Sequence, residues 1–136
     1  MEKETESSAP VFGRNNPFND ICGLEIAEQR SGRCTVVCRA GEKHLNLNGT
    51  VHGGLLFTMM DVAVRTVDSG EDIRCVTQNA STVFLRPGMP GTLTAEADVI
   101  RRGGRIVVAT VCLYDSERNL LTKGEFTYYV LRRSES

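Results

Sequence analysis

The chain has 136 residues, a hydrophobic fraction of 40% and a formal net charge of −1. This length fits one domain with a buried core and argues against a second full domain. Because sixteen Lys and Arg are balanced by seventeen Asp and Glu, no global field draws the chain toward nucleic acid or an anionic membrane. No apolar run approaches the roughly 20 residues that span a bilayer.

Residues 1–15 are polar, mixed in charge and without the apolar stretch of a secretory signal. We therefore expect a disordered or loosely ordered lead before a single domain over residues 16–136. The five cysteines are odd in number and scattered, which is typical of reduced thiols and indicates a cytoplasmic protein. The cysteines and histidines lack zinc-ligand spacing, and the glycine pairs lack the spacing of phosphate-binding loops, so we expect no metal and no cofactor.

The first elements are short. Residues 16–23 resemble a helical turn, and residues 24–40 resemble two strands broken near Ser31 and Gly32. A loop over residues 41–51 follows. Residues 54–68 then form a predicted helix whose first three turns have no polar face, which indicates burial on nearly all sides.

Strand-like segments fill the rest of the chain. They cover residues 74–85, 92–102, 105–114 and 120–131. Residues 92–99 alternate between apolar and polar, as in a half-buried strand, whereas residues 106–114 are apolar on both faces, as in a central strand. Gly103 and Gly104 predict a two-residue hairpin turn. One long helix followed by antiparallel strands predicts an α+β domain in which a single sheet curls around a central helix.

Two glycines and one acid mark this helix. Gly53 and Gly54 lie where it begins, so their N–H groups are among the unpaired donors at the positive end of the helix dipole and can bind a carbonyl oxygen that gains charge. Asp61 lies about 12 Å further along the axis at about 1.5 Å per residue. If both groups serve one carbonyl, a second copy must bring its helix antiparallel across a two-fold axis. The spacing then predicts a dimer with two shared sites.

Each residue also has a simpler interpretation. An ion pair between Asp61 and Arg65, four residues on, explains the acid as well as catalysis does. His52 fits a helix-start residue that bonds the backbone, the glycines fit a turn, and Asn46 fits an Asx turn in the loop. The combination of these residues, rather than any one of them, indicates a site.

The pattern N-x-x-G-T-x-H-G-G followed by M-x-D, from Asn46 to Asp61, resembles the hotdog-fold acyl-CoA thioesterases of the phenylacetic-acid-degradation type. The F-L-R-P-G segment at 84–88, the Arg-Gly-Gly-Arg turn and K-G-E-F-T-Y-Y-V at 123–130 extend the resemblance to nearly everything from about Pro17 onward. It implies a hotdog fold, homodimers with shared active sites that often assemble into homotetramers, and hydrolysis of small or medium acyl-CoA thioesters, aliphatic or aromatic.

The resemblance also implies roles for individual residues. The Gly53 N–H would polarise the thioester carbonyl, and Asp61 from the neighbouring subunit would be nucleophile or general base. Asn46 would orient the attacking water or the acid, His52 would brace the carbonyl region, and Thr77 would hold the water near Asp61. Apolar neighbours make a bare carboxylate costly at this position, which gives such polar partners a physical reason to be there.

The substrate-binding side is less marked. Gly54 leaves room for a close approach by the ligand, and Phe57 either lines the acyl pocket or belongs to the core. The candidates for binding the phosphates of CoA are Arg86, Arg101, Arg102 and Arg105, with Arg101 or Arg102 before the others, although solvated charges beside turns explain each of them equally well.

Two other functions use the same fold. A non-catalytic acyl-CoA-binding or regulatory hotdog domain is the first, and the presence of Asp61 argues against it. A hotdog enoyl-CoA hydratase or dehydratase is the second. It needs a His general base against the acyl C2–C3 bond, whereas His52 lies directly before the helix-entry glycines.

Overall fold

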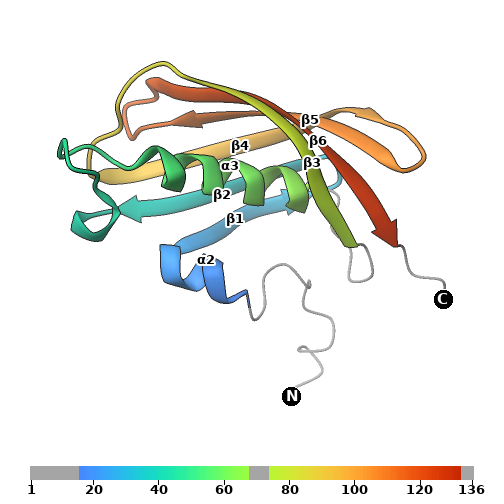
Figure 1. Cartoon of the computed structure of the whole chain (residues 1–136), viewed down its shortest axis with the longest axis horizontal. Coiled ribbons are helices and arrows are strands. Elements are labelled where there is room, and N and C mark those ends of the chain that lie inside the picture. Colours follow the sequence, from blue (N-terminus) through green and yellow to red (C-terminus); the bar gives the residue numbers. More distant parts are fainter. Residues whose placement is uncertain (1–15, 68–73, 133–136) are drawn as a thin grey trace.

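The computed structural model describes residues 16–67 and 74–132. One six-stranded antiparallel sheet curls around a single long helix, α3 (Figure 1), so the predicted α+β hotdog architecture is confirmed. The elements are α2 (Pro17–Cys22), β1 (Leu24–Arg30), β2 (Arg33–Ala40), the 3₁₀ turn η2 (Glu42–His44), α3 (Gly53–Thr66), β3 (Arg74–Phe84), β4 (Gly91–Arg102), β5 (Ile106–Tyr114) and β6 (Leu120–Arg132). The expected lead over residues 1–15 lies outside the described residues.

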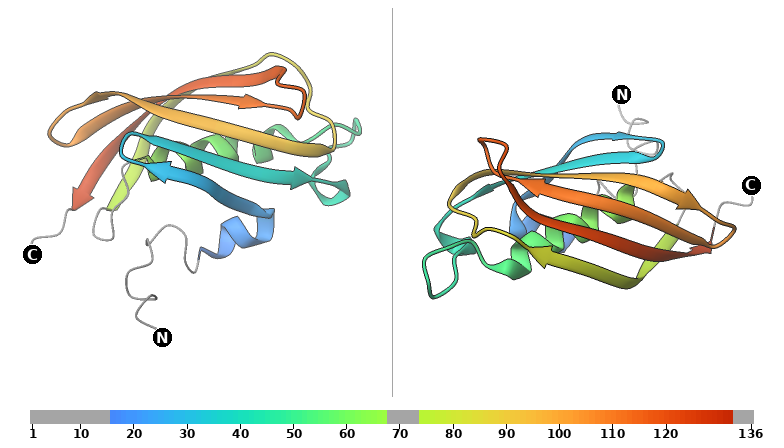
Figure 2. Two further views of the ribbon diagram at one scale, coloured as in Figure 1. Left: turned by 180° about the vertical axis from the view of Figure 1, so that it is seen from behind. Right: turned by 90° about the horizontal axis from the view of Figure 1, so that it is seen from above.

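The strand order is β1-β2-β4-β5-β6-β3, so β5 is an inner strand, as its apolar faces predict, and β3 forms one edge. The sheet bends over α3, which lies on its concave side (Figure 2). The core fills the space between them and includes Met59 and Met60 of the helix and Phe126 of β6, all without exposed surface. Among the described helices, none is long and apolar enough to cross a membrane.

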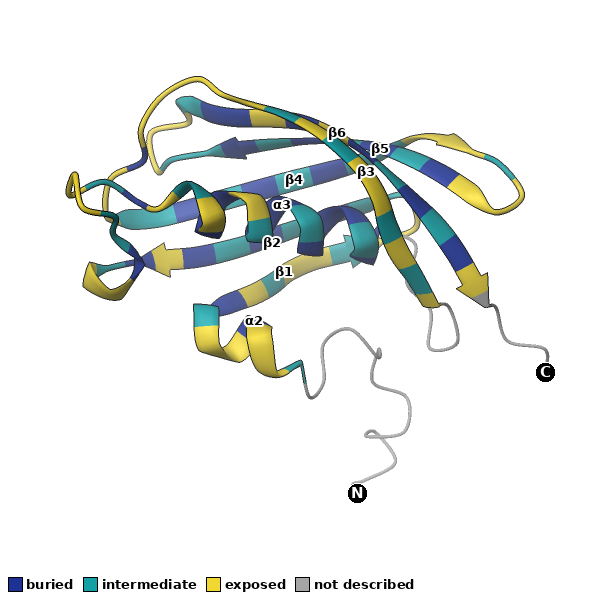
Figure 3. Cartoon of the chain, in the orientation of Figure 1, coloured by how far each residue is buried: buried dark blue, intermediate teal, exposed yellow. Residues whose placement is uncertain are grey.

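One face of α3 is less buried than the sequence predicts. Gly54, Phe57, Thr58, Asp61 and Arg65 are exposed or half-buried, whereas the residues between them are buried. Their spacing of three and four places them in one stripe along the helix (Figure 3). The prediction of burial on nearly all sides is therefore wrong for the single chain, because the sheet covers the helix from one side only.

The connection between β4 and β5 also differs from the prediction. β4 ends at Arg102 and β5 begins at Ile106, and the Gly103 N–H donates to the Ile106 carbonyl at 2.9 Å. Neither glycine of this connection has a positive φ, which the favoured two-residue hairpin turns require. Arg102 pairs with Val107 after a register shift between Val99 and Arg101, and the bond from Gly103 to Ile106 encloses Gly104 and Arg105, so the turn lies one residue further along the chain than predicted.

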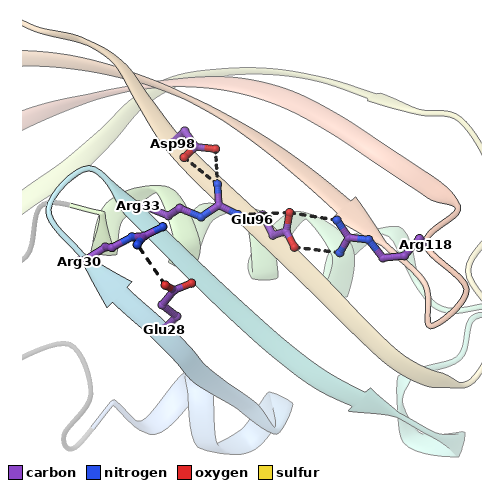
Figure 4. A network of polar contacts seen from close by, with 6 residues as sticks. All are labelled: Glu28, Arg30, Arg33, Glu96, Asp98 and Arg118. Atoms are coloured by element: carbon purple, nitrogen blue, oxygen red, sulfur yellow. Dashed lines mark hydrogen bonds and ion pairs between the residues drawn. The ribbon is translucent and has the colours of Figure 1, made fainter.

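A chain of charged side chains crosses the outer face of β2 and β4 (Figure 4). Arg33 bonds both carboxylate oxygens of Asp98 at 2.8 Å and lies 3.4 Å from Glu96. Arg118 contacts Glu96 at 2.9 Å and stacks on the Tyr114 ring at 3.9 Å from its centroid. Hydrogen bonding from Arg118 lowers the pKa of Glu96 below its usual range, and burial opposes this only in part. The network ties the outer face together far from the helix stripe.

Candidate active site

The loop before α3 is organised by Asn46. Its Oδ1 accepts hydrogen bonds from the backbone N–H groups of Asn48 at 2.8 Å and Thr50 at 3.1 Å, and its Nδ2 donates to the Thr50 hydroxyl at 2.9 Å. The Asx-turn interpretation therefore describes Asn46 in this chain. The proposed role of orienting water stays a prediction, because this amide makes no hydrogen bond to Asp61 within the described residues.

His52 caps the start of α3. Its Nδ1 accepts the Gly54 N–H at 2.8 Å, and its own backbone N–H donates to the His44 carbonyl at 2.8 Å. A Cβ atom on Gly54 would lie 3.0 Å from this ring nitrogen, closer than real Cβ contacts normally are. The helix cap therefore favours glycine at position 54 and engages its N–H group.

Gly53 is different from its neighbour. Its φ is not positive, and a Cβ atom there would meet only the Phe84 ring, at an ordinary contact distance of 3.6 Å. Within residues 16–67 and 74–132, no acceptor binds its N–H, which lies at the positive end of the helix dipole. The glycine borders a pocket of about 270 Å³ whose wall also includes Phe84 and Arg86. The folded chain itself therefore does not require glycine at position 53.

The acid of the stripe has two partners. The Thr77 hydroxyl donates to Asp61 Oδ1 at 2.6 Å, and Arg65 Nε donates to Oδ2 at 3.3 Å. The Asp61 side chain keeps 24% of its surface exposed. The structure thus contains both the helix ion pair and the contact with Thr77, which reaches the carboxylate directly rather than through a water molecule.

A β-bulge brings Thr77 to the helix. Thr77 pairs with Tyr128 and Asn79 with Thr127, so Gln78 is an extra residue in β3. In a regular strand, residues three apart face opposite sides. The bulge instead turns both Thr77 and Ala80 toward α3, and both are half-buried while Gln78 and Asn79 are exposed.

The remaining candidates lie apart. Phe57 is 37% exposed and packs its ring 5.4 Å from that of Phe126. Arg101 and Arg102 are exposed at the end of β4, on the side of the molecule where α3 ends rather than where it begins (Figure 1). Arg105 donates to the carbonyl groups of Val130 and Leu131 at 3.0 and 3.1 Å and so fixes the β4–β5 connection to β6.

Sequence reasoning missed His44. This side chain is 9% exposed, its Nδ1 accepts the Gly41 N–H at 2.9 Å, and its Nε2 lies 2.8 Å from the Cys22 carbonyl. Because Nδ1 is an acceptor, the proton must reside on Nε2, which donates to Cys22. A buried histidine has no pattern of its own in the sequence. The part of the chain that the structure describes contains no cluster of three His, Cys, Asp or Glu side chains able to hold a metal ion.

These groups are the candidates for two halves of a site. The first half is the unpaired Gly53 N–H with its pocket, and the second is the Asp61 carboxylate held by Thr77. Eight residues of helix, about 12 Å, separate them in one chain. The first half can stabilise negative charge on an oxygen, and the second can attack a carbonyl carbon or take a proton from water.

Known proteins are similar to this chain in sequence and in fold. The sequence profile of the thioesterase superfamily matches residues 48–122. A Saccharolobus solfataricus protein, which its name describes as an esterase, is 35% identical over 123 residues, covering 88% of this chain and 80% of that protein. The acyl-coenzyme A thioesterase PaaI of Escherichia coli is 33% identical over 90 residues, covering 62% and 64% of the two chains.

The solved structures agree. Escherichia coli PaaI superposes with a TM-score of 0.83 at 24% identity and covers 88% of both chains. A Streptococcus mutans protein bound to acetyl CoA superposes with a TM-score of 0.77 at 25% identity, covering 82% of this chain and 91% of that one. Since the profile spans more than half of the chain and the sequence relatives extend over most of the rest, this protein belongs to the thioesterase superfamily.

Proposed function

We propose that the protein is an acyl-CoA thioesterase whose sites form between two subunits, with the Gly53 N–H of one subunit and Asp61 of the other. The observation that carries the proposal is the contrast between the two glycines. The cap explains Gly54, whereas Gly53 has an unpaired N–H and no contact in the chain that excludes a side chain, since a Cβ there would meet only the Phe84 ring at an ordinary distance. The close approach of a ligand accounts for glycine at this position. The name of Escherichia coli PaaI and the acetyl CoA in the Streptococcus mutans structure support acyl-CoA as the substrate.

The chemistry requires little from the protein. A thioester carbonyl oxygen accepts a hydrogen bond from the Gly53 N–H, which stabilises the negative charge of the tetrahedral intermediate. In one route the Asp61 carboxylate removes a proton from the water that attacks the carbonyl carbon, and the CoA thiolate leaves. In the other route the carboxylate attacks the carbonyl carbon itself, the CoA thiolate leaves, and water then hydrolyses the mixed anhydride to release the acid and restore Asp61. The 2.6 Å hydrogen bond from Thr77 holds one oxygen of the Asp61 carboxylate. The orientation of the carboxylate is therefore fixed by its partners in the protein.

The unprotected edge strand β3 supports the proposal that two subunits pair. β3 pairs only with β6, and its eleven residues, RCVTQNASTVF, contain no proline and a single charge at the first position. Val76 and Val83 of this strand are 45% and 50% exposed. Monomers normally protect such an edge with charges, proline or a covering element. Pairing of two β3 strands would cover it and would set two α3 helices antiparallel, as the shared site needs.

A non-catalytic acyl-CoA-binding domain is the second candidate. The ion pair between Asp61 and Arg65 favours it, because an acid engaged in a helix pair needs no catalytic explanation. Release of free thiol, measured over a panel of aliphatic and aromatic acyl-CoAs, decides between the two. Turnover of any member that Asp61→Asn abolishes supports the thioesterase. Tight binding of acyl-CoA without turnover of any of them supports the binding domain.

Mixing two inactive variants tests the shared site. A hybrid dimer of Gly53→Pro and Asp61→Asn chains contains one site with both groups intact. Equal amounts that exchange at random give half hybrids, each with one of two sites, so roughly a quarter of the normal activity should return. If both groups served a site within one chain, the mixture would stay as inactive as its components.

A further inference from the structure

A second pocket lies beside the start of α3, on the side of α2. It has a volume of about 390 Å³, and its wall includes Ile21 and Cys22 of α2, Leu45, and Leu55 and Thr58 of α3. Gly54 and His52 border it as well, whereas Gly53 borders the smaller pocket near Arg86. The two pockets therefore flank the helix start, and a thioester held at the Gly53 N–H can extend one arm toward each.

Most polar groups around the α2-side pocket are already bonded. The Gly54 N–H donates to His52, and the Thr58 hydroxyl donates to the Gly54 carbonyl at 2.8 Å. Both ring nitrogens of His44 are engaged, one of them with the Cys22 carbonyl. What remains on the inner wall is largely hydrocarbon and the Cys22 sulfur, with Lys43 and the Nε2 side of the His52 ring at the exposed rim. The two amides of a pantetheine arm would lose hydrogen bonds in such a pocket, whereas an alkyl or aryl group would not.

The other pocket suits the opposite arm. It is bordered by Gly53, whose N–H is unpaired, and by Arg86, an exposed cation that complements the phosphates of CoA. An enclosed cavity of about 150 Å³ is enough for a benzene ring, so the α2-side pocket has room for a phenyl group or a medium alkyl chain. Acetyl would leave most of it empty.

We infer that the pocket between α2 and α3 binds the acyl group of the substrate, and that the side chain of Cys22 limits how large that group can be. The inference rests on the proposed thioesterase function and extends it to a substrate class, aryl or medium-chain acyl-CoA in preference to acetyl-CoA. The wall that bears Cys22 is fixed in place, because its carbonyl accepts hydrogen bonds from His44 at 2.8 Å and from the Cys38 thiol at 3.6 Å.

The test compares kcat/KM for acetyl-, octanoyl- and phenylacetyl-CoA. Cys22→Phe fills the pocket and should lower kcat/KM for the two larger substrates by about tenfold or more relative to acetyl-CoA. Cys22→Ser, of nearly equal volume, should keep the original profile. Ile21→Trp narrows the pocket from an exposed position, since Ile21 is 68% exposed, and should act in the same direction even if Cys22→Phe does not fold.

Leu85→Trp is the matched control, because Leu85 lines only the other pocket and is 52% exposed. Leu85→Trp should change kcat/KM for all three substrates by the same factor. The inference is overturned if Leu85→Trp lowers kcat/KM for the two larger substrates more than for acetyl-CoA. It is also overturned if Cys22→Phe and Ile21→Trp change kcat/KM for all three substrates by the same factor. If the unmodified protein releases thiol from none of them, the proposed function fails instead. In that case, dissociation constants of the same three acyl-CoAs for the same variants, measured by calorimetry, test whether the pocket binds the acyl group.

Discussion

The hydroxyl of Thr77 on the edge strand donates a 2.6 Å hydrogen bond to the carboxylate of Asp61 on the central helix. This contact orients the only acid on the exposed stripe of α3. Thr77→Val keeps the shape of the side chain and removes the donor. Since a hydrogen bond to a charged group contributes about 1.5–3 kcal/mol, thiol release should fall about 10- to 100-fold. Thr77→Ser keeps the hydroxyl and should stay close to the unmodified rate, and equal loss in both variants would contradict the role.

Gly53 and Gly54 should respond to substitution in opposite ways. Proline is accepted at the first position of a helix, and His52, with φ −61° and ψ 134°, has the conformation that precedes proline readily. Gly53→Pro therefore removes one N–H with little change in melting temperature, yet should lower kcat by about 10²- to 10³-fold.

Gly54→Ala should instead act on stability. Its Cβ would lie 3.0 Å from His52 Nδ1, so the capping bond must lengthen or break, at a cost of about 0.5–2 kcal/mol. Urea unfolding of the two variants measures this difference. A Gly53→Pro protein that keeps full activity would exclude its N–H as the donor to the carbonyl.

His44 should matter for stability, although it carries no charge in the tautomer that the structure requires. His44→Leu leaves the Gly41 N–H without its acceptor and the Cys22 carbonyl with only the weaker contact from the Cys38 thiol. A group left unpaired away from water costs about 1–3 kcal/mol, so the free energy of unfolding should fall. His44→Gln can replace an acceptor and a donor and should recover part of the loss. Denaturant unfolding compares the three proteins, and equal stability of the Leu and Gln variants would contradict this prediction.

The outer ion network predicts a loss of stability in acid. The pKa of Glu96 is lower in the folded protein than its ordinary value of 4.5, so the carboxylate stabilises the fold fully above that value. Its contribution is lost as the pH falls through the lowered folded pKa. Glu96→Gln should therefore flatten the dependence of the free energy of unfolding on pH below about 4.5, as measured by urea unfolding at several pH values. A slope unchanged by the substitution would contradict the prediction.

The cysteines should differ in reactivity. Burial raises the pKa of the Cys34 thiol to about 12, and burial also raises that of Cys38. Both side chains have at most 1% of their surface exposed, so a thiolate-directed reagent should modify them only after unfolding. Cys22 and Cys112 are half-buried and should react first. Peptide mapping after brief alkylation checks the order, and early labelling of Cys34 would contradict it.

Much of the fold could be predicted because its signals are local. The break at Ser31 and Gly32, the alternation of β4 and the apolar α3 each have a physical signature within a few residues. The motif from Asn46 to Asp61 also marked the candidate site. Of the two interpretations of Asp61, the structure contains the ion pair with Arg65, and the catalytic role stays a prediction.

Other features could not be predicted because they depend on distant partners. Thr77 faces the helix only through the bulge at Gln78, which breaks the two-residue period on which strand patterns rest. His44 acquires its role from Cys22, which lies far from it in the sequence. The less buried stripe of α3 was not evident in the sequence because Phe57 stands among its polar residues, and residue type alone does not reveal which face a sheet leaves uncovered.

The pairing of β3 has a consequence for the order of folding. β3 has only β6 as its partner, and Thr77 lies opposite Tyr128, so this strand cannot join the sheet until the last strand has been synthesised. Contacts of such long sequence separation form late and slowly. On the ribosome, α3 and the first strands can assemble while Asp61 still lacks Thr77, and the polar partner of the acid arrives only with the C-terminal strand.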